Sequence, residues 1–191
     1  MCFDVTRDDG FTVSDDPARL DFDVIHGFLK GSYWSPGVSR SVVERAAKNS
    51  LACGLYAPDG RQIGYVRAIT DKATFANLAD VFVLEEFRGK DLGVFMVDAV
   101  LKHPDLQGLR RITLASRDAR GLYARFGFVP LKDSEMKEML PRFMVKLSPQ
   151  EKRNCLPETT AQRPPLWARL SSYMRASARR MSSAGSVESS G

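Results

Sequence analysis

Long apolar runs, cysteine and histidine are all scarce in this sequence. No window approaches the roughly 18 apolar residues of a membrane span, and the N-terminus lacks the apolar segment of a signal peptide. Three cysteines, Cys2, Cys53 and Cys155, are too few and too widely spaced for a disulfide framework or a zinc site. The two histidines stand in no metal-ligand motif. We therefore expect a cytoplasmic protein with no stable membrane insertion and no metal.

Net positive charge is also scarce in most of the chain, although the whole chain carries +5. Residues 150–191 hold seven Lys or Arg and three acidic residues, so they supply +4 of that total. The remaining residues are nearly neutral, which argues against a nucleic-acid-binding surface on the folded part.

The chain of 191 residues suits one domain with an appended segment. We predict a domain over residues 1–148 and a basic, Ser/Arg-rich, partly disordered extension over 149–191, where composition turns polar and Pro-containing. Contact of this tail with a partner, and homodimerisation, are left open.

Hydrophobic periodicity predicts an α/β fold with a mixed, mostly antiparallel sheet flanked by helices. Pro58-Asp59-Gly60 is a hairpin turn signal between two strands. The expected elements are a strand at 11–15, a helix at 17–30, a loop at 31–38, a helix at 39–50, a hairpin at 51–71, a strand at 73–84, a helix at 91–102, a strand at 110–115, a helix at 117–126, and closing strands at 128–132 and 142–148.

The most informative segment is residues 76–93, ANLADVFVLEEFRGKDLG, in which a buried strand leads through a basic turn into a helix. The start of a helix presents free N–H groups and partial positive charge, and Arg88 and Lys90 add full charges. Gly89 and Gly93 let the backbone approach a ligand closely. Such a turn suits a phosphate or diphosphate.

This segment resembles the coenzyme-A-binding motif of the GNAT N-acetyltransferases, a strand followed by Arg/Gln-x-x-Gly-x-Gly/Ala. Val83 ends the strand, Arg88 takes the Arg/Gln position and Gly93 takes the last Gly/Ala position. Asp91 stands where the family usually has its middle glycine.

Residues 110–128 resemble a second GNAT pattern, a strand followed by Asn-x-x-Ala-x-x-Leu-Tyr and then Gly-Phe. Ser116 occupies the usual asparagine position. The matching residues are Ala119, Leu122, Tyr123, Gly127 and Phe128. The resemblance covers roughly residues 11–147 and fades in the tail. It implicates acetyl-CoA as co-substrate.

The resemblance implies a sheet whose two central strands splay apart, with the pantetheine arm of the cofactor in the gap. Main-chain groups of the strand would hold the pantetheine, and the basic turn would hold the diphosphate. The implied cofactor-binding residues are Val81, Phe82, Val83, Arg88, Gly89, Lys90, Asp91, Leu92, Gly93 and Ser116.

Two residues are candidates for catalysis by this resemblance. Tyr123 falls on a family tyrosine placed to protonate the coenzyme A sulfur, although it could instead be a core tyrosine. Asp80 is a charge within an apolar strand. It could bind the acceptor amine or relay its proton, or it could form an ion pair with Arg67 or Arg111.

Tyr33 and Trp34, in the loop 31–38, are the candidate acceptor-binding residues, since aromatic rings hold amines by cation–π contact. We expect an acyltransferase that moves acetyl from acetyl-CoA to a primary amine of a small molecule by direct attack. The alternatives are a protein lysine or N-terminal acetyltransferase and a non-catalytic acyl-CoA-binding module.

Overall fold

One six-stranded sheet organises the chain, in the spatial order β1-β2-β3-β4-β5-β6. The computed structural model describes residues 2–142, 144 and 146. All strand pairs are antiparallel except β5 and β6, which are parallel. The strands are β1 Asp4–Thr6, β2 Thr12–Ser14, β3 Leu51–Tyr56, β4 Gln62–Thr70, β5 Phe75–Val83 and β6 Arg111–Leu114. The predicted mixed, mostly antiparallel sheet is confirmed.

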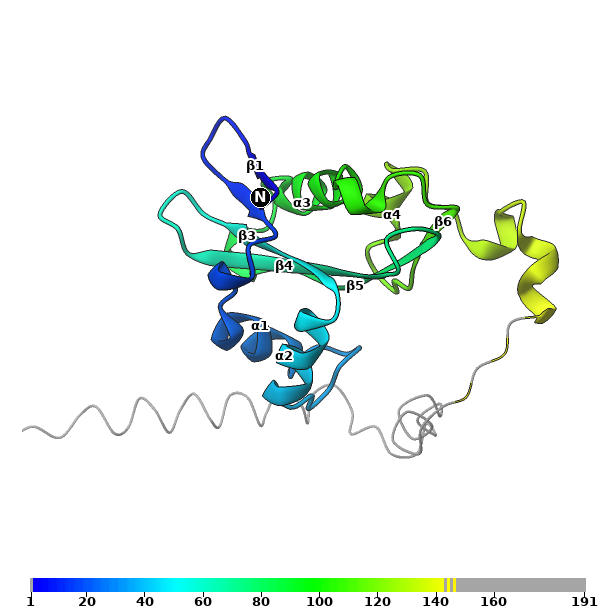
Figure 1. Ribbon diagram of the computed structural model, residues 1–191, viewed down its shortest axis with the longest axis horizontal. Coiled ribbons are helices and arrows are strands. Elements are labelled where there is room, and N and C mark those ends of the chain that lie inside the picture. Colours follow the sequence, from blue (N-terminus) through cyan, green and yellow to red (C-terminus); the bar gives the residue numbers. More distant parts are fainter. Residues whose placement is uncertain (1, 143, 145, 147–191) are drawn as a thin grey trace, which may run out of the picture. The chain divides into compact units, whose positions relative to one another are not determined.

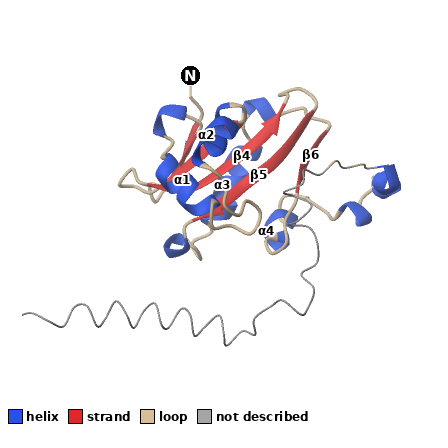
Figure 2. Cartoon of the chain, turned by 90° about the horizontal axis from the view of Figure 1, so that it is seen from below, coloured by secondary structure: helices blue, strands red, loops and turns tan. Residues whose placement is uncertain are grey.

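Four α-helices cover the two faces of this sheet (Figure 1). They are α1 Phe22–Leu29, α2 Arg40–Lys48, α3 Leu92–Leu101 and α4 Arg120–Ala124. The pair α1 and α2 lies on one face, and α3 and α4 lie on the other. Two apolar cores result, one centred on Val66 and Met96 and one centred on Tyr65 and Ile25. Figure 2 shows β6 at the edge of the sheet, with β4 and β5 inside it.

Local sequence explains how α1 begins. Asp21 is its N-cap, and one carboxylate oxygen accepts from the N–H groups of Asp23 and Val24 at 2.8 and 3.2 Å. Ile25 and Leu29, four residues apart, face the core. The single helix expected over 17–30 is therefore two elements, a 3₁₀ turn at Pro17–Arg19 and then α1.

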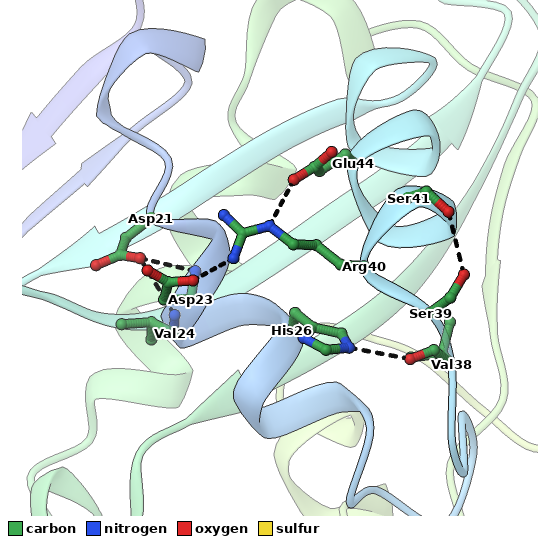
Figure 3. Close-up of polar contacts among 9 residues, drawn as sticks. All are labelled: Asp21, Asp23, Val24, His26, Val38, Ser39, Arg40, Ser41 and Glu44. Atoms are coloured by element: carbon green, nitrogen blue, oxygen red, sulfur yellow. Dashed lines mark hydrogen bonds and ion pairs between the residues drawn. The ribbon is translucent and has the colours of Figure 1, made fainter.

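An arginine joins α1 to α2 (Figure 3). Arg40, the first residue of α2, pairs with Asp23 of α1 and donates from Nε to Glu44 of its own helix at 2.7 Å. His26 of α1 lies 3.1 Å from the carbonyl oxygen of Val38, which precedes α2. These contacts fix the two ends of the loop 31–38.

Several expected elements differ from the structure. Residues 128–132 form no strand, because Pro130 lacks an N–H group and a 3₁₀ turn follows at Leu131–Asp133. Strand β1 was not expected, and it turns the N-terminus into a hairpin with β2. By themselves, residues 137–142 form a 3₁₀ helix, Lys137–Arg142. The rest of the expected strand 142–148 and the extension 149–191 fall largely or wholly outside the described residues.

No helix among residues 2–142 is both long enough and apolar enough to cross a bilayer.

Close packing around Gly64 gives a stability prediction. A Cβ atom at Gly64 would stand 2.8 Å from the carbonyl oxygen of Phe82 on the neighbouring strand. We expect Gly64→Ala to cost about 1–3 kcal/mol of unfolding free energy, because backbone must shift to admit the methyl group. Urea denaturation measures this cost.

Gly27 is the matched control, since a Cβ atom there meets nothing within 4 Å. Gly27 lies inside α1, so Gly27→Ala should raise stability by about 0.5–1 kcal/mol. Equal effects of the two substitutions would show that the approach of β4 to β5 is looser than described.

Candidate active site

The pairing of strands β5 and β6 ends about halfway along β5. Their parallel pairing runs from Phe75 with Arg111 to Leu78 with Leu114, and β6 ends there. β5 continues to Val83. No described strand pairs with this last part of β5 on the β6 side, which leaves a strand edge of the kind that extended ligands join.

A β-bulge lies where the strands part. On β4, Tyr65 pairs with Phe82 and Arg67 pairs with Ala79. The one β4 residue between Tyr65 and Arg67 therefore stands opposite two residues of β5, Asp80 and Val81. Asp80 has φ of 54°, a conformation that aspartate adopts more readily than most residues. The extra residue bends the strand and redirects the side chains that follow.

The carboxylate of Asp80 is held by Arg67. Arg67 Nε donates to Asp80 Oδ2 at 2.5 Å, and its Nη1 donates to the Ser50 hydroxyl at 3.2 Å. Both side chains are mostly buried, with exposed fractions of 17% for Arg67 and 12% for Asp80. Of the two ion pairs left open for Asp80, the structure forms the one with Arg67. Arg111 instead lies over the ring of Phe75.

The basic turn after β5 leads into α3 as the sequence predicts. Gly89 has φ of 79° with open space where a side chain would stand, and Asp91 is the N-cap of α3 with φ of 54°. No side chain caps the first turn of α3. Arg88 Nε donates to the carbonyl oxygen of Val83 at 3.2 Å, and Lys90 lies over the ring of Phe87. The N–H groups of the turn thus stand next to two cations.

The carboxylate of Asp91 is directed to α4. Its Oδ1 lies 3.5 Å from Nη1 of Arg125, the residue at the end of α4. Because this carboxylate makes no cap hydrogen bond, it does not occupy the N–H groups at the start of α3. The departure from the family glycine therefore leaves these N–H groups without a side-chain cap.

Tyr123 is buried in α4, with an exposed fraction of 7%, and its ring meets Phe128 edge-on at 6.0 Å. Burial, followed by the electrostatic effects of Tyr33 and Asp118, raises the pKa of Tyr123 to about 12. The phenol therefore keeps its proton across the neutral and moderately alkaline range. Ser116 Oγ accepts from the N–H of Ala119 at 3.0 Å, which shapes the turn into α4.

The loop 31–38 reaches across to this turn. The guanidinium carbon of Arg117 lies 3.6 Å from the centroid of the Tyr33 ring. The hydroxyl of Tyr33 lies 3.5 Å from Asp118 Oδ1. Trp34 meets Tyr33 edge-on at 4.9 Å. Both rings remain substantially exposed, at 44% for Tyr33 and 39% for Trp34. The structure thus brings the predicted acceptor residues to the vicinity of Tyr123.

Comparisons with known proteins agree with this geometry. Residues 48–130 match the model of the acetyltransferase (GNAT) domain. A Gibberella zeae protein assigned as an acetyltransferase is 31% identical over 142 residues, which cover 63% of this chain and 78% of that protein. The chain belongs to the GNAT acetyltransferase family.

Solved structures show the same fold in other members of this family. A Xanthomonas campestris protein assigned to the GNAT family is 44% identical, with a TM-score of 0.66 over 73% of this chain and 94% of that one. A Deinococcus radiodurans structure is 18% identical, with a TM-score of 0.57 over 80% of this chain and 99% of that one, and it supports the fold alone.

Sequence reasoning missed the aromatic pair that joins α1 to β5 in this GNAT chain. The rings of Phe28 and Phe82 are stacked, with centroids 3.9 Å apart and planes 8° apart. No short-range pattern could reveal a contact between residues so far apart. Among the described residues, no hydrogen bond or ion pair joins Asp80 to Tyr33 or Tyr123, and no group of His, Cys, Asp and Glu side chains could hold a metal ion.

The Arg67–Asp80 pair generates a stability prediction. Asp80→Ala should lower the unfolding free energy by about 2 kcal/mol or more, because it leaves the guanidinium of Arg67 mostly buried without its carboxylate. Chemical denaturation measures the loss. Asp98→Ala is the control, since Asp98 forms an exposed pair with Lys102 within α3, and it should cost less than about 0.5 kcal/mol. Equal costs would contradict a structural role for the buried pair.

Proposed function

We propose that this protein transfers the acetyl group of acetyl-CoA to a primary amine of a small molecule by direct attack. The observation that carries the proposal is the edge of β5 that no described strand pairs, followed through the basic turn by the uncapped start of α3. This pairing of features suits one long ligand with an amide-rich arm and a diphosphate. Membership of the family supports acetyl-CoA as that ligand.

In this proposal, the donor lies along the gap between β5 and β6. Main-chain groups of Val81, Phe82 and Val83 would pair with the amides of the pantetheine arm, as one strand pairs with another. The turn from Arg88 to Gly93, including Gly89, Lys90, Asp91 and Leu92, would bind the diphosphate. Ser116 would make a weaker side-chain contact with the cofactor than the usual asparagine, because its hydroxyl already accepts from the N–H of Ala119.

The reaction needs a proton at the sulfur and a neutral amine at the carbonyl carbon. The amine nitrogen would form the new C–N bond as the C–S bond breaks, and the departing thiolate would take the proton of the Tyr123 hydroxyl. The proton that the nitrogen loses would pass to water, and the Tyr123 phenolate would regain a proton from water. Burial raises the pKa of Tyr123 to about 12, so the phenol holds the proton that a general acid must supply at neutral pH.

A covalent acetyl-enzyme on Cys53 is disfavoured. Burial raises the pKa of the Cys53 thiol to about 12, so this cysteine is a thiol and not the reactive thiolate. It is also completely buried in the sheet.

The acceptor would enter beside the loop 31–38. Tyr33 and Trp34 offer exposed aromatic faces, although Arg117 already covers one face of Tyr33. The ion pair with Arg67 balances the charge of the Asp80 carboxylate, so Asp80 would not attract polycations by net charge. We propose instead that Asp80 relays the proton of the amine through water.

Tyr123→Phe tests the proposed general acid. We expect turnover to fall by about 100-fold, because the phenol proton is lost, while the Kd for acetyl-CoA stays nearly unchanged. Steady-state kinetics and isothermal titration measure the two quantities. Because its pKa is about 12, titration of Tyr123 should not reduce turnover below about pH 10. Unchanged turnover in Tyr123→Phe would remove this residue from the chemistry.

Titration with acetyl-CoA, followed by a thiol-release assay with amines, tests the function itself. We expect binding in the micromolar range and thiol release with at least one polyamine, amino acid or arylamine. Release only with peptides would favour a protein acetyltransferase. Binding without release from any acceptor would favour the acyl-CoA-binding module, and no binding at near-millimolar acetyl-CoA would overturn both forms.

A further inference from the structure

The hairpin formed by β1 and β2 touches the basic turn at the start of α3. Arg7, directly after β1, donates from Nη1 to the carbonyl oxygen of Lys90 at 3.1 Å. These residues are 83 positions apart in the chain. None of the motifs that identify the family includes Arg7, so this contact is a feature of the fold and not of the motif.

The guanidinium of Arg7 is held on several sides. Asp9 accepts from its Nε at 2.7 Å and from its Nη2 at 2.6 Å, in a two-bond fork. The rings of Phe11 and Phe95 lie 5.4 and 5.6 Å from it. Phe95 belongs to the first turn of α3, so Arg7 contacts the turn and the helix at once.

The backbone of the hairpin fixes Arg7 as well. Its N–H donates to the carbonyl oxygen of Phe11 at 2.8 Å, and its own carbonyl oxygen accepts from Gly10 at 2.8 Å. Gly10 has φ of 88°, which the tight loop requires. A side chain anchored at both ends of its length can impose a position on the group it binds.

Holding the Lys90 carbonyl also orients the next N–H group. A peptide unit is planar, and in the trans form its C=O and N–H bonds point in opposite directions. The described chain contains no cis peptide bond. When Arg7 holds the oxygen of Lys90, the N–H of Asp91 must therefore point away from the hairpin. That N–H is one of the groups at the start of α3 that the proposed function assigns to the diphosphate.

Arg7 also offsets the one acidic residue of the turn. The pKa of Arg7 is raised, first by its hydrogen bond to Asp9 and also by the charges of Asp9 and Asp91. Arg125 stands 3.5 Å from Asp91 on the α4 side. Asp91, which replaces the family glycine, thus has a cation in each of two neighbouring elements, and its repulsion of an anionic ligand is reduced.

We infer that Arg7 is a positioning residue for the donor site, which orients the turn 88–93 through the Lys90 carbonyl. The inference rests on the proposed function, since it assigns the turn to the diphosphate of coenzyme A. Three of the five N–H donors of Arg7 are already engaged by Asp9 and Lys90. The contact of Arg7 with the turn is made to a main-chain oxygen, so we assign its action to the backbone of the turn.

Titration of coenzyme A into the full chain tests this inference. We expect Arg7→Ala to weaken binding by about 5- to 10-fold. Arg7→Lys should recover little, because an ammonium group cannot reproduce a planar fork that binds Asp9 and the carbonyl together. Arg40→Ala is the control, since Arg40 also bridges two carboxylates but joins α1 to α2 (Figure 3), and it should change the Kd by less than 2-fold.

Dephospho-coenzyme A separates a role of Arg7 at the diphosphate turn from direct contact with the 3′-phosphate. It lacks the 3′-phosphate but keeps the diphosphate, so a positioning role predicts the same fold-loss for both ligands in Arg7→Ala. A loss that disappears with dephospho-coenzyme A would assign Arg7 to the 3′-phosphate and overturn the inference. Turnover at saturating acetyl-CoA should stay within 2-fold of the unchanged protein, because Arg7 acts on binding.

The remaining outcomes are also distinct. No binding by the unchanged protein would overturn the proposed function, and the inference with it. Binding by the unchanged protein and equal binding by Arg7→Ala would overturn the inference alone. If Arg7→Ala does not fold, Asp9→Asn replaces it, since it loosens the fork without removing Arg7. That variant should bind coenzyme A about 2- to 3-fold more weakly, and unchanged affinity would contradict the inference.

Discussion

The parting of β5 from β6 is the constraint on which the rest of the candidate site depends. A paired strand has its hydrogen-bonding groups satisfied by its neighbour, whereas no described strand pairs with β5 from Ala79 to Val83 on the β6 side, because β6 stops at Leu114. The bulge at Asp80 lies at the same point, and it costs the sheet one regular pair. The buried contact of Asp80 with Arg67 compensates by tying the bulged strand back to β4. The end of the β5–β6 pairing and the ion pair that holds the bulge to β4 therefore lie at the same place in the sheet.

Much of this fold could be predicted from the sequence, because its signals are short-range. The hairpin at 58–60 and the helices α2 and α3 are marked by turn residues and by apolar spacing, and all are confirmed. The expected strand at 128–132 is wrong, because an apolar pattern says nothing about whether a partner strand is present. The sequence pattern does not reveal β1 because only three residues form it, and its pairing with β2 depends on a turn in which Gly10 has φ of 88°.

The candidate site was predictable only as a set of residue types. Asp80 could have paired with Arg67 or Arg111, and strand register decided between them. Arg67 stands opposite Ala79, next to Asp80, whereas Arg111 stands opposite Phe75, near the other end of β5. The contact of Tyr33 with Asp118 spans 85 positions and depends on how a loop folds back over the sheet. No local pattern encodes such a distance, and the roles of Tyr33 and Tyr123 remain proposals.

The stacked rings of Phe28 and Phe82 place α1 in direct contact with β5. Phe82 belongs to the strand whose backbone would receive the donor, and Phe28 belongs to the helix that leads into the loop of Tyr33 and Trp34. Two rings in contact at 3.9 Å leave no slack between them. In the proposed function, a shift of β5 on donor binding would therefore move Phe28 and with it the helix that leads into the acceptor loop.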